Sequence, residues 1–207
     1  MHDLIILIPA YNEINNLNKI LKNNYNFLII DDCSNDGTEK LLKKKKIKYI
    51  KNLKNIGYEK SLIKGFSYLK NKKIKYVCTL DGDGEHPINK IKQIYSLAKK
   101  KKIDLIICNR KSKNRLLENI LSNLFKIRFG LEDPLSGMKM YYMPKLKKII
   151  NKIDKNSFLV DVVKTFIDKK YKIFNYEIST KKKLGESKVG HNLYVQLKIL
   201  KLLRYII

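Results

Sequence analysis

Short apolar runs alternate with longer segments of helical spacing in the first half of the chain. The apolar runs cover residues 4–8, 27–30, 76–80 and 104–108. Runs of this length, bounded by polar or turn residues, are typical of buried parallel strands. Apolar side chains recur with the period of a helix over residues 14–21, 58–69 and 88–98. The alternation predicts an α/β fold built on a doubly wound, mainly parallel sheet.

The second half of the chain is less regular. Residues 132–137 form a stretch with Pro and Gly, residues 159–166 have helical spacing, and residues 181–190 form a basic loop. We expect no repeat and no linker, so that residues 1–190 form a single domain.

The end of the chain, residues 191–207, is expected to form an amphipathic helix. It is mostly apolar, and Lys198, Lys201 and Arg204 recur at every third position, which places them on one stripe of a helix. Such a helix either packs against the domain or lies at a membrane surface, and the sequence favours neither.

Composition restricts the class of protein. A chain of 207 residues is long enough for one domain with a sizeable core. The formal net charge of +26 indicates an anionic partner, which is nucleic acid, a membrane surface or a phosphorylated substrate. Three cysteines without paired spacing predict buried thiols in a reducing compartment. We find no signal peptide pattern and no membrane-spanning run, which predicts a cytoplasmic location.

Polar residues follow each predicted strand, at the edge where α/β sheets bind ligands. The acidic stretch 81–87 is the most informative of them. Asp81 and Asp83 are spaced so that both carboxylates point to one side of an extended chain, and Gly82 between them lets a ligand approach the backbone. Glu85 adds a third oxygen. Mg²⁺ or Mn²⁺ prefers such a set when a diphosphate completes its shell, although an Asp-Gly turn exposed to solvent has the same pattern.

Six motifs occur in order over nearly the whole chain, namely PAYNE, IDDCSNDGT, NIGYEKSLIKGF, LDGDGEHP, DPLSGMKMY and KLGESK. Together they resemble family 2 glycosyltransferases, most closely those like dolichyl-phosphate mannose synthase and related polyprenyl-phosphate hexosyltransferases. The resemblance implies a GT-A fold. It also implies that the nucleotide-sugar site comprises Pro9, Tyr11, Glu13, Asp32, Asp81, Gly82 and Asp83, with the metal held by Asp81, Asp83 and Glu85.

The acceptor side is implied by the same resemblance. Arg110 matches an arginine that meets the acceptor phosphate, and Ser136, Lys182 and Lys188 complete the predicted acceptor-phosphate site. The chain has Lys139 and Lys182 where the family usually has arginine, which keeps the charge but loses the bidentate fork. His86 and Pro87 are interpreted as residues that shape the loop.

The expected reaction is an inverting transfer of a hexose, mannose from GDP-mannose first, to polyprenyl or dolichyl phosphate. A phosphate nucleophile is already anionic and needs no strong base, whereas a hydroxyl acceptor would need one, for which Asp133 is the candidate. The predicted catalytic set is Asp83, Arg110 and Asp133.

Other readings remain open. The alternative enzyme is a glycosyltransferase that uses UDP-glucose or another donor, with a polyprenyl-phosphate or glycan acceptor. A basic nucleic-acid-binding protein is a distant alternative. Because the lysines are scattered rather than gathered on one element, we expect no nucleic acid partner. Attachment to the anionic cytoplasmic face of a membrane is expected to be peripheral or through a small membrane-anchoring subunit.

Overall fold

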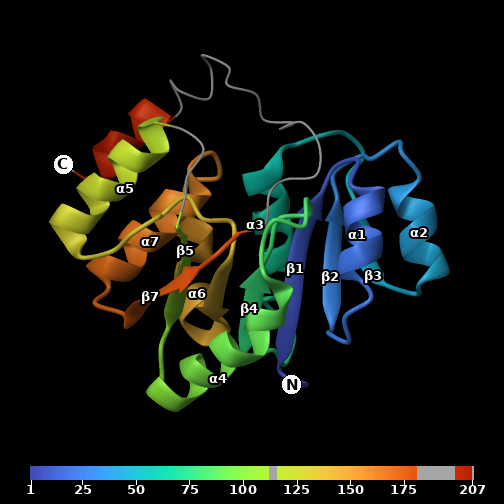
Figure 1. The fold of residues 1–207 in the computed structure, drawn as a ribbon, viewed down its shortest axis with the longest axis horizontal. Helices are drawn as coiled ribbons and strands as arrows, with labels where there is room; N and C mark the ends of the chain where they lie inside the picture. Colours follow the sequence, from blue (N-terminus) through green and yellow to red (C-terminus); the bar gives the residue numbers. More distant parts are fainter. Residues whose placement is uncertain (112–115, 181–198, 207) are drawn as a thin grey trace.

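A computed structural model describes residues 1–111, 116–180 and 199–206 (Figure 1). The strands are β1 (Leu4–Ala10), β2 (Phe27–Asp31), β3 (Lys48–Lys51), β4 (Tyr76–Thr79), β5 (Leu105–Arg110), β6 (Lys139–Tyr142) and β7 (Ile173–Ile178). The α-helices are α1 (Ile14–Ile20), α2 (Thr38–Lys44), α3 (Tyr58–Leu69), α4 (Ile91–Lys101), α5 (Leu116–Phe129), α6 (Met143–Ile149) and α7 (Phe158–Asp168). Short 3₁₀ turns cover Ile88–Lys90, Ile150–Lys152 and Leu202–Tyr205.

The strands form one sheet of seven, in the order β3-β2-β1-β4-β6-β5-β7. All neighbours are parallel except β6, which runs antiparallel to both β4 and β5. The predicted α/β class is therefore confirmed. Because β6 runs the other way, it delivers the loop that precedes it to the carboxyl ends of β4 and β5.

Helices cover both faces of the sheet because successive strand residues point to opposite sides. In β1, Leu7 packs with Phe66 of α3 in one hydrophobic cluster, whereas Ile8 packs with Leu17 of α1 in the other. The first cluster also takes in α5, α6 and α7, and the second takes in α4.

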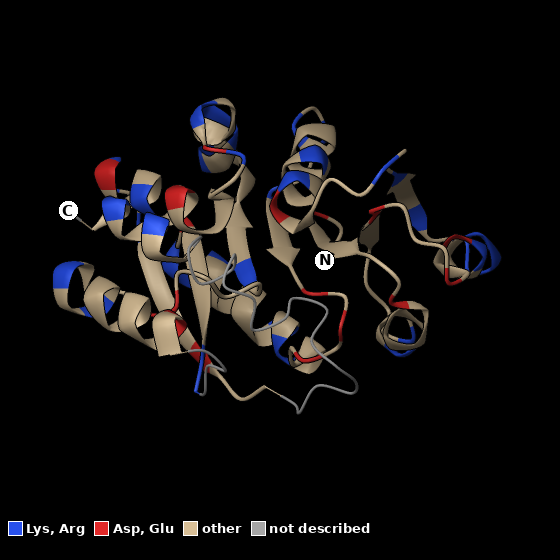
Figure 2. Ribbon diagram, turned by 90° about the horizontal axis from the view of Figure 1, so that it is seen from above, with Lys and Arg blue, Asp and Glu red and all other residues tan. Residues whose placement is uncertain are grey.

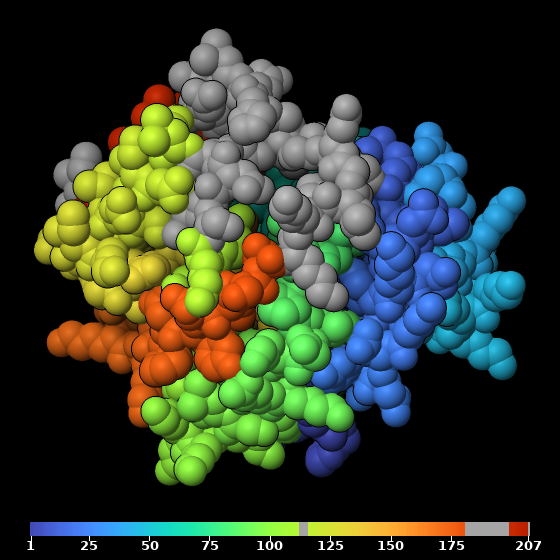
Figure 3. Space-filling view, viewed as in Figure 1, coloured from blue at the N-terminus to red at the C-terminus, as the bar shows by residue number. Residues whose placement is uncertain are grey.

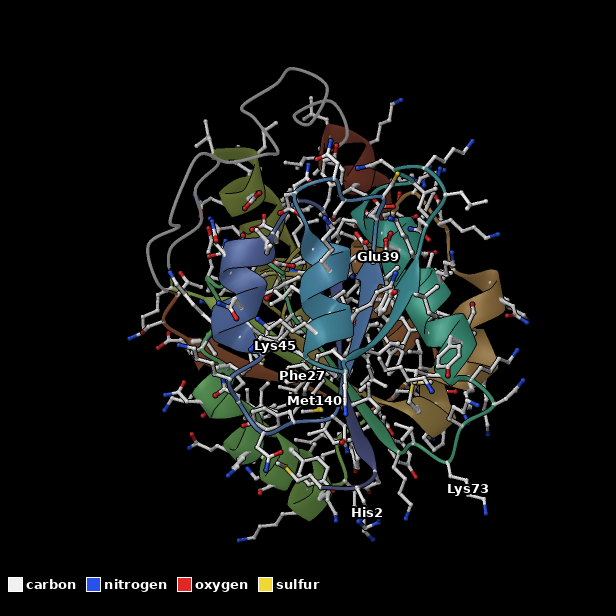
Figure 4. All side chains as sticks on the ribbon, turned by 90° about the vertical axis from the view of Figure 1, so that its right-hand side faces the viewer. His2, Phe27, Glu39, Lys45, Lys73 and Met140 are labelled. Atoms are coloured by element: carbon white, nitrogen blue, oxygen red, sulfur yellow. The ribbon has the colours of Figure 1, made fainter. Side chains whose placement is uncertain are left out.

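The four predicted strands are present as β1, β2, β4 and β5, while β3, β6 and β7 were not predicted. The two edge strands, β3 and β7, keep half-exposed side chains and so lack a continuous apolar run. Figure 4 looks onto the β3 edge, where Glu39 of α2 forms ion pairs with Lys43 and with Lys51 of β3. Charged side chains of this kind prevent further strands from pairing at an edge.

The end of the chain packs against the domain where it is described. Residues 199–201 are helical, and Ile199 and Leu202 are 5% and 4% exposed in the cluster that contains α7. Arg204 forms an ion pair of 2.7 Å with Asp154. The rest of the predicted helix, including Lys198 and the boundary at residue 190, lies outside the described residues.

Candidate active site

The loops that follow the parallel strands lie along one edge of the sheet, where ligand sites of such folds are found. Figure 2 looks down on this edge. Acidic residues lie in the loops near the middle of the view, and Lys and Arg residues lie on several of the helices around them. The acidic stretch after β4 is therefore at the position that the sequence predicts.

Asp81 lies at the start of the acidic loop and is held by His86. The Asp81 side chain is 30% exposed, and its Oδ2 atom lies 3.0 Å from Nε2 of the buried His86 ring. Burial by itself raises the pKa of the Asp81 carboxyl, but His86, Tyr58 and Arg110 together outweigh it, and the net pKa is lowered. Asp81 is therefore an anion at neutral pH. His86 positions this carboxylate, as the interpretation of His86 as a loop-shaping residue anticipates.

Gly137 closes against the other side of the Asp81 carboxylate. A methyl group placed on Gly137 would lie 2.1 Å from Oδ1 and 2.4 Å from Oδ2 of Asp81. These distances are far below van der Waals contact, so only a residue without a side chain fits here. The loop before β6 and the acidic loop after β4 thus meet at this one carboxylate.

Asp83 and Glu85 lie half-exposed further along the acidic loop. The backbone N–H of Glu85 donates a hydrogen bond of 3.1 Å to Oδ1 of Asp83, across a turn in which Gly84 has a φ of 78°. Within the described residues, no group of three or more His, Cys, Asp or Glu side chains is arranged to hold a metal ion. Two carboxylates nevertheless suit Mg²⁺ or Mn²⁺ when phosphates and water complete the shell. The oxygen donors of Asp81 and Asp83 therefore fit such an ion, and Glu85 as a third ligand stays a prediction.

The loop after β1 packs directly on the acidic loop. A methyl group on Gly82 would lie 3.2 Å from the carbonyl oxygen of Pro9 and 3.5 Å from Cγ of Glu13. Glu13 accepts a hydrogen bond of 2.7 Å from Asn16, and the Tyr11 side chain is 41% exposed. Of the predicted nucleotide-sugar residues, Pro9 thus lies near the end of β1, Tyr11 and Glu13 follow in the next loop, and Gly82 lies on the acidic loop beside Pro9 and Glu13.

Asp32, the remaining predicted nucleoside residue, anchors a neighbouring loop. Its carboxylate accepts hydrogen bonds from the backbone N–H groups of Ile56 and Gly57, at 2.9 and 2.8 Å, and from the Asn52 side chain at 2.7 Å. Asp32 is 4% exposed. These bonds fix the loop that leads into α3, so any effect of Asp32 on a nucleoside is exerted at least in part through this loop.

Arg110 and Asp133 form a largely buried pair where the acceptor phosphate is predicted to bind. Nε and Nη2 of Arg110 donate to the two carboxylate oxygens of Asp133 at 2.8 and 2.9 Å, and Nη2 also lies 3.2 Å from Glu118 of α5. Burial lowers the pKa of Arg110, but the carboxylates of Asp133, Glu118 and Asp81 together more than offset this, and the net pKa is raised. Asp133 is 1% exposed. A carboxylate paired with a permanent cation is a weak base, so this geometry gives no support to Asp133 as the general base.

Ser136 and Lys139 face the interior. The Ser136 hydroxyl donates a hydrogen bond of 2.6 Å to the carbonyl of Cys108, and the residue is fully buried. The Lys139 ammonium donates to the carbonyls of Pro134 and Ser136 at 2.8 and 2.6 Å. Burial lowers the pKa of Lys139 to about 8. Both side chains shape the loop, and contact between Ser136 and an acceptor phosphate stays a prediction that this geometry does not support.

Comparison with known proteins agrees with this arrangement. Residues 5–132, which include the first acidic loops and Arg110, match the sequence profile of Glycosyl transferase family 2. The chain belongs to this family. The uncharacterized protein MJ0544 of Methanocaldococcus jannaschii is 31% identical over 170 residues, covering 77% of this chain and 74% of that protein. A second protein of that organism, MJ1222, is 24% identical over 96% of this chain and 89% of its own length.

The fold of this family 2 glycosyltransferase is the GT-A fold. Glucosyl-3-phosphoglycerate synthase of Mycobacterium tuberculosis, solved with uridine diphosphate, superposes with a TM-score of 0.73 over 98% of this chain and 79% of that one. Its complex with Mn²⁺, uridine diphosphate and phosphoglyceric acid gives a TM-score of 0.74, covering 98% of this chain and 78% of that one. The identity is 13% in both cases, so the likeness shows the fold alone.

Some residues of the glycosyltransferase site were missed by sequence reasoning. Glu118 is 6% exposed and pairs with Arg110, and the roles of Gly137 and Lys139 appear only when the loop before β6 is placed. The predicted acceptor residues Lys182 and Lys188 lie outside the described residues. No helix in the described part of the chain has the length and apolar character needed to cross a membrane.

Proposed function

We propose that this family 2 glycosyltransferase moves a hexose from a nucleotide-sugar donor to polyprenyl or dolichyl phosphate at a membrane surface, with inversion at the anomeric carbon. Mannose from GDP-mannose is the first donor to test. The observation that carries the proposal is that the acidic loop after β4 lies close to the largely buried side chain of Arg110. Asp81 and Arg110 are close enough to shift each other's pKa, so a donor diphosphate with its metal and an anionic acceptor would bind at neighbouring positions.

The donor side is assigned to the loops after β1 and β4. Asp81 and Asp83 are the residues that would hold Mg²⁺ or Mn²⁺, and Glu85 is the proposed third ligand. A bound divalent ion would neutralise the charge of the departing nucleoside diphosphate. The exposed ring of Tyr11 offers an aromatic face to a nucleoside base, and Glu13 offers acceptors for its N–H or hydroxyl groups.

The acceptor side is assigned to Arg110. Its side chain is 16% exposed, and the guanidinium is oriented by the bidentate pair with Asp133. A phosphate oxygen of the acceptor attacks the anomeric carbon, and the bond from that carbon to the diphosphate breaks. Since this nucleophile is already an anion, no proton has to be removed by Asp133. We assign Asp133 the role of positioning Arg110 rather than that of a base.

A second candidate is transfer of glucose from UDP-glucose to a small soluble phosphate compound. Glucosyl-3-phosphoglycerate synthase, with which this chain shares its fold, has been solved with UDP-glucose, Mn²⁺ and phosphoglyceric acid. Both acceptors carry a phosphate group, which Arg110 would contact in each case. The two differ in the donor base and in whether the product partitions into organic solvent.

The experiment is transfer of radiolabelled sugar from GDP-mannose and, in parallel, from UDP-glucose. Polyprenyl phosphate and phosphoglyceric acid serve as acceptors, each with Mg²⁺, with Mn²⁺ and with a chelator. We expect metal-dependent label in the organic phase with polyprenyl phosphate. Label that appears only in a soluble product would favour the second candidate, and no turnover of any donor would refute both.

The metal assignment is tested with Asp83→Ala, because Asp83 is half-exposed and is one of the two carboxylates assigned to the metal. We expect transfer to fall by at least about 100-fold, since a group that acts electrostatically in the transition state is removed. Asp168→Ala is the matched control, because Asp168 is 56% exposed and pairs with Lys164 on α7. Full activity of Asp83→Ala at an unchanged melting temperature would contradict the assignment.

A further inference from the structure

Helix α5 exposes three large apolar side chains along its outer face. Leu116 is 76% exposed, Ile120 is 42% exposed and Ile127 is 83% exposed. Steps of four and seven residues are close to whole helical turns, so the three lie on one side of the helix. They extend over roughly 16 Å at 1.5 Å per residue. We call these three side chains the α5 stripe.

The α5 stripe is not needed to hold the helix in place. The opposite face of α5 is buried, with Leu121 and Phe125 at 1% and 0% exposure in the same hydrophobic cluster as α7. In Figure 3 the residues of α5 lie at the outer surface, at the upper left of the view. Burial of one face fixes the helix and leaves the other face, with its three apolar side chains, toward solvent.

The polar residues around the α5 stripe carry positive charge or none. Asn119, Asn123, Lys126 and Arg128 occupy the other exposed positions of the helix. The acidic residue of α5, Glu118, is buried and paired with Arg110. The Lys126 side chain stays 63% exposed although it contacts Glu132 at 2.8 Å. Apolar side chains beside cations, with no exposed carboxylate on the helix, are typical of a helix that lies on an anionic lipid surface.

We propose that the α5 stripe docks this enzyme onto an anionic phospholipid bilayer. Glu118, in the first turn of α5, contacts Arg110 of the candidate acceptor site at 3.2 Å, so the stripe begins next to that site. Docking through α5 would therefore place the candidate acceptor site at the membrane surface, where the phosphate group of a lipid acceptor lies. This use of the docking surface rests on the proposed function, whereas binding of α5 to lipid does not.

The test is flotation of the purified full-length protein with vesicles. One set of vesicles is phosphatidylcholine alone and the other contains phosphatidylglycerol in equal parts. The triple variant Leu116→Gln, Ile120→Gln, Ile127→Gln removes the α5 stripe and keeps residues that favour a helix. Leu53→Gln is the matched control, because Leu53 is fully exposed and follows β3, at the sheet edge opposite to β7. Circular dichroism and the melting temperature check that each variant is folded.

We expect the parent and Leu53→Gln to float with the anionic vesicles, and the triple variant to lose at least tenfold in its partition coefficient. Equal flotation of the triple variant and the parent would overturn the proposal, because lysines elsewhere would then account for binding. Failure of the parent to float would overturn it as well.

Transfer to a short, water-soluble prenyl phosphate separates docking from the reaction. The triple variant should equal the parent with this acceptor and fall behind it only with long-chain acceptor in vesicles. An equal loss with both acceptors would show that α5 acts on the site itself and would overturn the docking role. Absence of transfer by the parent would refute the proposed function while leaving the flotation result to stand alone.

Discussion

Replacing Gly137 by alanine tests whether the Asp81 carboxylate is held in one position for function. The added methyl group would lie 2.1 Å from Oδ1 of Asp81, where ordinary contact begins at 3.4 Å, so the two groups must separate by roughly 1.3 Å. The carboxylate cannot move without disturbing its 3.0 Å contact with His86. Asp81 is a short side chain at a strand end, so part of the shift has to be taken up by the backbone.

Two quantities follow from this shift. Overpacking of this kind costs typically about 1–3 kcal/mol of unfolding free energy. Misplacing a group of the site by about 1 Å lowers the rate roughly 100-fold. We therefore expect Gly137→Ala to fold with a lower melting temperature, to need more Mg²⁺ or Mn²⁺, and to lose about 100-fold in kcat.

Gly65→Ala is the matched control, because it overpacks the core away from the site. A methyl group on Gly65 would lie 2.4 Å from Cδ1 of Leu7, in the interface between α3 and β1. Alanine in a helix offsets part of the cost by about 0.5–1 kcal/mol. Thermal unfolding and metal-dependent transfer are measured for both variants. If Gly137→Ala kept the kcat and metal requirement of Gly65→Ala, Asp81 would not be a positioned ligand and the reasoning would be wrong.

Three further predictions concern buried charges. Arg110→Lys loses the bidentate contact with Asp133, so we expect the unfolding free energy measured in urea to fall by about 2 kcal/mol and the KM for the acceptor to rise. An unchanged KM would argue against contact between Arg110 and the acceptor. Asp32→Asn points an amide at the N–H of Gly57, so unfolding free energy should fall by about 1–3 kcal/mol and the donor KM should rise. Burial lowers the pKa of Lys139 from 10.5 to about 8, so above pH 8 the unfolded chain binds more protons than the folded one, and stability rises with pH. Relative to Lys139→Met, the unfolding free energy of the parent should increase by roughly 1 kcal/mol per pH unit up to about pH 10. Unfolding free energies that vary with pH in the same way for both proteins would refute this.

The sequence predicts the first half of the fold well because those strands are buried on both faces. Strands β1, β2, β4 and β5 are built around continuous apolar runs, so the run in the sequence marks the buried strand in the sheet. Strands β3 and β7 lie at the edges, where half the side chains meet water and the apolar run breaks up. Strand β6 is four residues long and directly follows a polar loop. Its antiparallel direction is a tertiary property that no local pattern encodes.

The acidic loop after β4 could be located from the sequence alone, because alternating strands and helices place the carboxyl ends of the parallel strands at one edge of the sheet. The same argument reaches Arg110, which terminates β5. It does not reach the partners of Arg110, because Asp133 and Glu118 come from a loop and a helix whose approach depends on how β6 turns back. A role for Asp133 as a base was inferred from its residue type, whereas the pairing that weakens it as a base depends on distance.

Lys139 shows most clearly why the rest could not be predicted. The chain has 45 Lys and Arg residues, and composition gives every lysine the same expectation of exposure. One of them is nevertheless fully buried, and it is stable there because the carbonyls of Pro134 and Ser136 turn inward within hydrogen-bond distance. Those carbonyls take this direction in a loop where Asp133 adopts a φ of 50° and Gly137 meets Asp81. The identity of the buried lysine is therefore set by the backbone of the loop before β6, so a substitution at Lys139 should report on that loop rather than on surface charge.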